Sequence, residues 1–186
     1  MMFIGIAGGI ILLGGVVLAL RRQKDIVIED VPALKVTSSA FEDGGKIPVK
    51  YTGNGEDVSP ELQLAELDKE AVSLVVIMDD LDHPLDGVYN HWLIWNVPPM
   101  TIIPAEIPEG KQVSGLADAV QGVGYGKHRY RGPKPPFGSH RYKYNVFVLD
   151  TTMDLAASTK KRALLEAMEG HILQYGYLIG EYTANN

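Results

Sequence analysis

The sequence predicts a single mainly β domain that follows an N-terminal transmembrane helix. Two observations support the β prediction. Short apolar runs rich in β-branched residues recur along the chain, and segments rich in proline and glycine separate them. Only one stretch, near the C-terminus, has the spacing of a helix with one apolar face. We therefore expect a mainly antiparallel β core with little helix.

Composition limits the kinds of protein that this chain can be. Its 186 residues are enough for one domain with a substantial core, and an apolar fraction of 46% excludes a disordered chain. The absence of cysteine excludes a thiol nucleophile, a disulfide framework and a Cys-ligated metal site. The net charge of −6 argues against nucleic acid as the main partner.

The first 20 residues contain no charged side chain, and three basic residues follow them, Arg21, Arg22 and Lys24. An apolar helix of about 20 residues can span a bilayer. We expect an uncleaved membrane anchor over residues 1–22, since a secretion signal, the alternative, has its basic residues before the apolar run. Because positive charge stays on the cytoplasmic side, the domain is expected at the cytoplasmic face of the membrane.

The rest of the chain divides into a linker and one domain. Residues 23–35 mix charged and apolar side chains, and we expect a linker there that ends in an edge strand. Residues 36–186 contain no repeat and no second linker, so we assign them to one globular domain. The expected strands are a short one at 47–51, two that are buried on both faces at 73–78 and 91–97, and a partly alternating one at 142–149.

The predicted helix lies close to the C-terminus. Ser158 or Thr159 can cap its first turn. Two glycines, at positions 176 and 180, weaken the helical pattern farther along the chain. We interpret the apolar stripe of the helix as core packing, and its members are Leu164, Leu165, Met168 and Ile172.

Polar residues follow the strand at 73–78 at once, in the sequence Asp79-Asp80-Leu81-Asp82-His83-Pro84. A buried strand that ends in carboxylates delivers them to the rim of a sheet, where they can form a site. The alternative is that Asp and Pro only end the strand and form a turn. His91 opens the next apolar strand, where it is either a ligand-binding residue or a core histidine.

The long loop at 122–141 carries a local excess of positive charge. No acidic residue lies between Asp118 and Asp150, and the basic residues of this window are Lys127, Arg129, Arg131, Lys134, Arg141 and Lys143. The loop therefore suits an anion, unless its charges only balance acidic neighbours. It lacks the glycine spacing of a nucleotide-binding loop, and its prolines make a stiff wall.

His140 and Tyr142 are two residues apart at the start of a predicted strand, so their side chains share a face and Arg141 points to the other. An imidazole and a phenol can donate hydrogen bonds to an oxyanion. Arg141 is better placed to pair with a carboxylate, such as Asp80 or Asp82, and so to hold two loops together.

Four segments, in this order, resemble the phosphatidylethanolamine-binding protein family, in particular its bacterial and archaeal Raf-kinase-inhibitor-like branch. They are an opening SSAFEDGGKIPVKYTGNGEDVSPEL, a central DDLDHP followed by HWLIWNVP, a GPKPPFGSHRY segment, and MEGHILQYGYLIGEY, which looks like a closing helix. The resemblance covers about residues 38–182. It implies a large antiparallel sheet packed against a smaller one, with peripheral helices.

The resemblance also implies a small pocket that binds phosphate-type anions or phospholipid headgroups, and we expect no metal and no cofactor. The implied pocket residues, with Asp82 at the edge and residues 132–136 as one wall, are Asp80, Asp82, His91, Gly132, Pro133, His140 and Tyr142. A cis peptide between His83 and Pro84 is implied as well. Three residues depart from the family pattern, Leu64, Leu81 and Val123, and the last two lie near the pocket, so ligand preference can differ.

The sequence therefore favours a membrane-tethered, non-catalytic binding module. Its imidazoles and phenol would donate to phosphate oxygens, Asp80 would accept from a ligand amine or hydroxyl, and binding would weaken as the pH rises past about 6.5. Two alternatives stay open. One is a regulator of a membrane-associated protein partner, and the other is a hydrolase or metal enzyme that uses the His and Asp residues.

Overall fold

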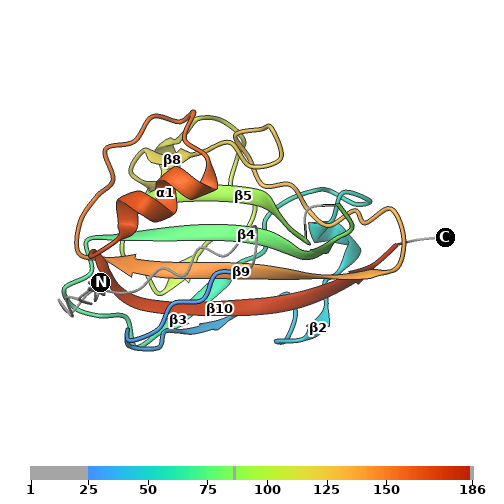
Figure 1. Ribbon diagram of the computed structural model, residues 1–186, viewed down its shortest axis with the longest axis horizontal. Helices are drawn as coiled ribbons and strands as arrows, with labels where there is room; N and C mark the ends of the chain where they lie inside the picture. Colours follow the sequence, from blue (N-terminus) through green and yellow to red (C-terminus); the bar gives the residue numbers. More distant parts are fainter. Residues whose placement is uncertain (1–24, 86, 185–186) are drawn as a thin grey trace, which may run out of the picture.

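The computed structural model describes residues 25–85 and 87–184, and this part of the chain forms two β-sheets (Figure 1). The larger sheet has the strand order β2-β10-β9-β4-β5-β8-β7, and the smaller has the order β1-β3-β6. The strands are β1 (Lys35–Thr37), β2 (Gly45–Lys46), β3 (Leu62–Ala65), β4 (Ser73–His83), β5 (Gly87–Val97), β6 (Ile102–Ile103), β7 (Gln112–Val113), β8 (Ala119–Gln121), β9 (Ser139–Leu149) and β10 (Ile172–Thr183). Strand β2 runs parallel to β10, whereas the other strand pairs are antiparallel. The prediction of a mainly β fold with a large and a small sheet is confirmed.

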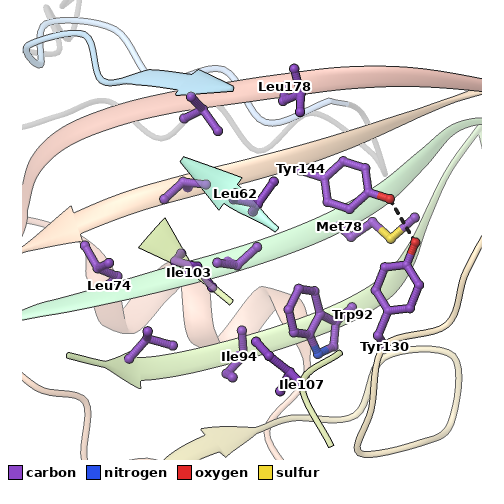
Figure 2. Close-up of a cluster of buried hydrophobic side chains, with 14 of the residues drawn as sticks. Leu62, Leu74, Met78, Trp92, Ile94, Ile103, Ile107, Tyr130, Tyr144 and Leu178 are labelled. Atoms are coloured by element: carbon purple, nitrogen blue, oxygen red, sulfur yellow. Dashed lines mark hydrogen bonds between the residues drawn. The ribbon is translucent and has the colours of Figure 1, made fainter. Parts of the chain in front are cut away.

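Strands β4, β5 and β9 form the centre of the large sheet, and their apolar runs are buried on both faces. One face packs against the small sheet, and Figure 2 shows this cluster, which contains Met78 and Trp92 of the large sheet and Leu62 of the small sheet. The Tyr130 and Tyr144 hydroxyls hydrogen-bond within it at 2.9 Å. The other face carries a second apolar cluster, which helix α1 (Lys161–Met168) covers. Burial on both sides explains why these strands are nearly continuous apolar runs.

The C-terminal segment is a strand, not a continued helix, so this part of the helix prediction is wrong. Helix α1 ends at Met168, and β10 alternates between buried and partly exposed residues from Ile172 onwards. Ile172 joins the apolar cluster of the helix although it belongs to the strand. Gly176 fits close strand packing, because a Cβ there would lie 2.0 Å from the Leu34 carbonyl oxygen.

Two local details also differ from the prediction. Helix α1 is preceded by Lys160, whose side chain makes no capping hydrogen bond, so neither Ser158 nor Thr159 caps it. The strand expected at 47–51 is replaced by β2 and a 3-10 helix over Val49–Tyr51. A second 3-10 helix spans Ser114–Leu116. At the first of these segments a contact with β10 replaces the expected pairing, since the Ile47 N–H donates to the Glu181 carbonyl oxygen at 2.8 Å.

The expected transmembrane helix, and with it the membrane localisation, must be corrected. Within residues 25–85 and 87–184, no helix is long and apolar enough to cross a membrane. The residues on which the anchor was placed, 1–22, lie outside the part of the chain that the structure describes.

Residues 25–34, at the end of the expected linker, lie against the large sheet. The Leu34 N–H donates to the Tyr175 carbonyl oxygen at 2.8 Å, and the side chains of Ile26 and Leu34 are buried. The Lys143 ammonium binds the Asp25 carboxylate at 2.8 Å. Strand β1 follows as an edge strand of the small sheet.

Candidate functional site

Three neighbouring strands bring the predicted pocket residues together at one end of the large sheet. Asp80 lies on β4, His91 on β5, and His140 and Tyr142 on β9. Asp80 and Tyr142 are direct partners across the β4–β9 ladder. The four residues are only 2%, 5%, 4% and 0% exposed, respectively. Side chains that are so polar and so buried are stable only when they have hydrogen-bonding partners.

A β-bulge places His91 in this cluster. Met78 pairs with Trp92 and Asp79 pairs with Asn90, so His91 is one extra residue on β5. A bulge turns a side chain to one face of the sheet although strict alternation would place it on the opposite face. The His91 ring consequently lies 5.4 Å from the Tyr142 ring, in an edge-to-face arrangement. The strand begins at Gly87, so His91 lies within the strand and does not open it.

Both imidazoles use their Nδ1 atoms for bonds to the protein. His140 Nδ1 lies 2.8 Å from Asp80 Oδ2, and His91 Nδ1 lies 2.7 Å from the Arg131 carbonyl oxygen. A carbonyl and a carboxylate only accept, so each Nδ1 carries the hydrogen. The Nε2 atoms make no hydrogen bond to the described residues. Each is an acceptor when its ring is neutral and a donor when its ring is charged.

The Tyr142 hydroxyl is buried and makes no hydrogen bond of good geometry with the described residues, although the Asp80 carboxylate and the Lys134 backbone lie close to it. Burial, and then the nearby Asp80 charge, hold the pKa of Tyr142 well above its usual value. The hydroxyl is therefore protonated over the whole physiological range and is available as a donor. A buried hydroxyl without a partner is rare and costs stability.

Two tyrosines that the sequence reasoning did not assign to the pocket complete the surroundings of His91. The Tyr125 and Tyr89 rings lie 5.0 Å and 6.2 Å from the His91 ring. The two tyrosine rings are 5.2 Å apart. The Arg131 guanidinium lies 5.7 Å above the Tyr125 ring. No local pattern in the sequence predicts that Tyr125 lies close to His91, because this contact depends on how the glycine-rich loop returns to β5.

The positive charge of the loop is mostly balanced within the protein. Arg129 and Arg131 pair with Asp57, Arg141 pairs with Asp82, and Lys143 pairs with Asp25. The two remaining basic residues of the window, Lys127 and Lys134, form no ion pair with the described residues. The alternative interpretation of the loop, charges balanced by acidic neighbours, therefore holds for most of it.

Asp57 fixes the proline-containing wall, and the sequence reasoning missed it. Its Oδ1 accepts from the Gly132 N–H at 2.6 Å, and its Oδ2 accepts from Arg131 at 2.8 Å. Gly132 is needed for close packing, because a Cβ there would lie 2.4 Å from the Tyr51 carbonyl oxygen. The Pro133 carbonyl oxygen accepts from the Gly53 N–H at 2.9 Å. Gly132 and Pro133 are thus buried parts of a wall that Asp57 anchors.

Asp82 lies at the rim, where its carboxylate pairs with Arg141. It accepts two side-chain hydrogen bonds from Arg141, at 2.8 and 2.7 Å, and a third from the Arg141 N–H at 2.9 Å. The Arg141 bonds lower the pKa of Asp82 below its usual value. This pair joins the end of β4 to the start of β9. The implied cis peptide before Pro84 is not observed: the described residues contain no cis peptide bond.

The side chains of this site offer hydrogen-bond donors. Within residues 25–85 and 87–184, no three His, Asp or Glu side chains converge in a way that could hold a metal. Tyr142 offers an O–H donor, and both Nε2 atoms become donors on protonation. The Asp80–His140 pair also resembles the carboxylate and imidazole of a general base, which keeps acid–base chemistry within reach of this site.

Stability should depend on pH through His91. Burial lowers the pKa of His91, and the Arg131 carbonyl and the Asp80 charge only partly oppose this effect. The unfolded chain then binds a proton below about pH 6.5 while the folded chain does not. We expect the free energy of unfolding to fall as the pH falls below about 6.5, down to the pKa of the folded state. Urea unfolding of the wild type and of His91→Gln measures this, and the wild type should lose more stability. Parallel losses in the two proteins would contradict it.

Comparison with known proteins places these residues in a family. Residues 37–183 match the family model described as phosphatidylethanolamine-binding protein. A UPF0098 protein from Archaeoglobus fulgidus is 46% identical over 151 residues, which are 78% of this chain but only 50% of that relative. The chain thus spans half the length of that relative. A UPF0098 protein from Pyrococcus horikoshii is 43% identical over 83% of this chain and 78% of its own.

Solved structures agree with the family match. The phosphatidylethanolamine-binding protein homologue CT736 from Chlamydia trachomatis superposes with a TM-score of 0.73 at 36% identity, over 82% of this chain and 99% of its own. YbcL from Escherichia coli gives the same TM-score of 0.73 at 21% identity, with the same coverage of 82% and 99%, and shows the fold alone. The relatives come from archaea and bacteria. The chain belongs to the phosphatidylethanolamine-binding protein family.

Proposed function

We propose that the protein is a non-catalytic binding module whose site holds the phosphate group of a small molecule or of a phospholipid headgroup. One observation carries the proposal. The Tyr142 hydroxyl is a buried donor without a partner among the described residues, and it lies beside two imidazoles whose Nε2 atoms are also unused. A tetrahedral anion that accepts from all three would remove the cost of the unpaired hydroxyl.

Each residue then has a separate role. Tyr142 donates from its hydroxyl, and His91 and His140 donate from Nε2 when protonated. Both Asp80 oxygens already accept hydrogen bonds, one from His140 and one from the Asp82 N–H at 2.9 Å. We therefore assign Asp80 to orienting His140 in place of contacting a ligand amine. Gly132 and Pro133 form the wall. Of the two loop lysines without an ion pair among the described residues, we assign Lys134, next to the wall, to the ligand.

A titration followed by NMR tests the proposal. Inorganic phosphate and phosphoethanolamine are added to the full chain at about pH 5.5 and about pH 7.5, on either side of the ordinary His pKa of about 6.5. We expect shifts at His91, His140 and Tyr142, tighter binding at the lower pH, and loss of these shifts in His91→Ala and His140→Ala. Sulfate, which keeps its charge over this range, separates titration of the imidazoles from titration of the phosphate. Absence of any shift with all three anions would contradict the proposal.

The enzyme alternative rests on one observation, the bond between Asp80 and His140, which would orient a general base. The same samples decide it. Phosphorus NMR of phosphoethanolamine should show binding without release of inorganic phosphate. Release that depends on His140 would instead make the site a hydrolase and would contradict the non-catalytic part of the proposal.

A further inference from the structure

The side chain of Asn90 holds the bulge that turns His91 into the candidate site. The Asn90 amide nitrogen lies 3.0 Å from the Met78 carbonyl oxygen and 3.2 Å from the Trp92 carbonyl oxygen. Met78 and Trp92 are the ladder partners next to the bulge. A bulge interrupts the ladder because its extra residue has no partner. The amide therefore supplies donors to a carbonyl oxygen on each strand at the point of interruption.

The same amide is held by a buried ion pair. Asn90 Nδ2 also lies 3.1 Å from Asp79 Oδ1, so its two hydrogens are shared among three acceptors. Asp79 Oδ2 lies 2.5 Å from the Lys161 ammonium. Asp79 is completely buried. A buried carboxylate is stable only when it is paired and hydrogen-bonded. Lys161, at the start of helix α1, thus fixes Asp79 on the face of the sheet that the helix covers, and Asp79 fixes the orientation of the Asn90 amide.

Backbone contacts join the loop and the start of the helix to the same bulge. The Tyr125 N–H donates to the Asn90 carbonyl oxygen at 3.1 Å, and the Val123 N–H donates to that of Thr159 at 3.1 Å. A Cβ at Gly124 would lie 2.8 Å from the Trp92 nitrogen. The loop therefore packs directly on the bulge, and it is tied on its other side to the residues that lead into helix α1.

We propose that Asn90 is a positioning residue of the anion site: its amide, held by Asp79 and Lys161, keeps the bulge that places His91 beside Tyr142. The inference rests on the proposed function in one respect, because it calls the site an anion site. Its physical content, the position of the His91 ring, is measurable without a ligand. Lys161 then acts on the site through the sheet, from helix α1.

An NMR titration of the His91 imidazole in the ligand-free full chain tests this role. Asn90→Ala removes no charge, so a changed pKa of His91 reports a changed position. We expect the pKa to move up from its lowered value towards about 6.5, because the ring leaves its buried place. Asn145→Ala is the matched control, since the Asn145 amide also donates to a β4 carbonyl oxygen, that of Ile77 at 3.1 Å, but from β9, on the side of β4 opposite to the bulged strand. This control should lose stability and keep the wild-type titration of His91.

The groups that contact or face the His91 ring are unchanged in both variants. They are Asp79, Asp80, Tyr89, Tyr125, Arg131 and Tyr142. A difference between Asn90→Ala and Asn145→Ala therefore comes from the bulge. If the two variants titrate alike, the surrounding sheet holds the bulge without Asn90, and the inference is wrong.

Binding of inorganic phosphate gives the second readout. We expect the Kd to rise about tenfold in Asn90→Ala, equivalent to about 1.4 kcal/mol, and to stay unchanged in Asn145→Ala. A wild-type protein that binds no phosphate would contradict the proposed function alone, and the His91 titration would still decide the positioning role. Equal affinities in wild type and Asn90→Ala would overturn the positioning role even where phosphate binds.

Lys161→Met keeps the inference testable if Asn90→Ala does not fold. Its side chain is 20% exposed, so no core side chain is removed, but Asp79 loses its cation and this variant should also lose stability. Loss of a charge by itself changes the pKa of His91, so the readout here is the nuclear Overhauser contact between the His91 and Tyr142 rings. A weaker contact than in wild type supports the inference. An unchanged contact shows that the ion pair does not hold the bulge and overturns this part of it.

Discussion

Replacement of Asp57 by alanine is expected to lower the free energy of unfolding by about 3 kcal/mol, because three donors lose one acceptor in a mostly buried place. The donors are the side chains of Arg129 and Arg131 and the N–H of Gly132. The Asp57 side chain is only 13% exposed, so water cannot fully replace it. Its φ of +59° adds strain for alanine. Urea denaturation measures the loss.

The same substitution should weaken binding of phosphate. Arg131 supplies the carbonyl oxygen that binds His91 Nδ1, and Gly132 begins the wall beside Tyr142. When Asp57 no longer holds either residue, the bond that orients His91 is lost together with the wall. The phosphate titration described above, repeated on Asp57→Ala under conditions where the variant is folded, measures this effect.

Two variants separate the causes. Asp57→Asn suits the left-handed backbone and keeps an acceptor for Gly132, so it isolates the loss of charge opposite the two arginines and should cost less than alanine. Glu109→Ala removes a carboxylate that lies 3.7 Å from Arg129 but is 75% exposed, and it should cost about 0.5 kcal/mol or less. Equal losses in Asp57→Ala and Glu109→Ala would show that Asp57 is an ordinary surface charge.

The central strands were predictable because their apolar runs have one environment. Residues 74–78, 92–95 and 146–149, in β4, β5 and β9, are buried on both faces, so the apolar pattern is strong over a short window. The C-terminal segment lacks this property. Ile172 packs with the apolar residues of helix α1, although it belongs to β10, and spacing alone therefore extended the helix too far. Its pairing with β9, which decides the matter, is not a local property of the sequence.

Some residues of the candidate site could likewise be predicted from the sequence, and others could not. Alternation along one strand is enough to put His140 and Tyr142 on one face, and the pairing of Arg141 with Asp82 agrees with its position on the other. His91 needed more than alternation, because a bulge turns it. Asp57 could not be found at all from local pattern, since its partners are more than 70 residues away in sequence. Contacts of this range depend on the fold, and the family resemblance supplied part of that information.

The second large effect is expected for Tyr142→Phe, which should weaken phosphate binding by about tenfold while leaving the ligand-free protein as stable as wild type or more stable. The loss of binding corresponds to one hydrogen bond to a charged group, worth about 1.5–3 kcal/mol. The stability should rise by as much as about 1 kcal/mol, because the substitution removes a buried hydroxyl that has no partner among the described residues. Phosphate titration and urea denaturation of the same samples measure the two effects.

Tyr144→Phe is the matched control, since Tyr144 lies two residues along the same strand on the same face. Its hydroxyl hydrogen-bonds to that of Tyr130 at 2.9 Å, so its removal should cost about 1 kcal/mol of stability and leave phosphate binding unchanged. If the free energy of unfolding rises in Tyr142→Phe and falls in Tyr144→Phe, the Tyr144 hydroxyl stabilises the fold and the Tyr142 hydroxyl is available to a ligand. Tyr142→Phe that is destabilised like Tyr144→Phe, with unchanged phosphate affinity, would contradict this assignment, because the Tyr142 hydroxyl would then have a partner inside the protein and no reason to meet an anion.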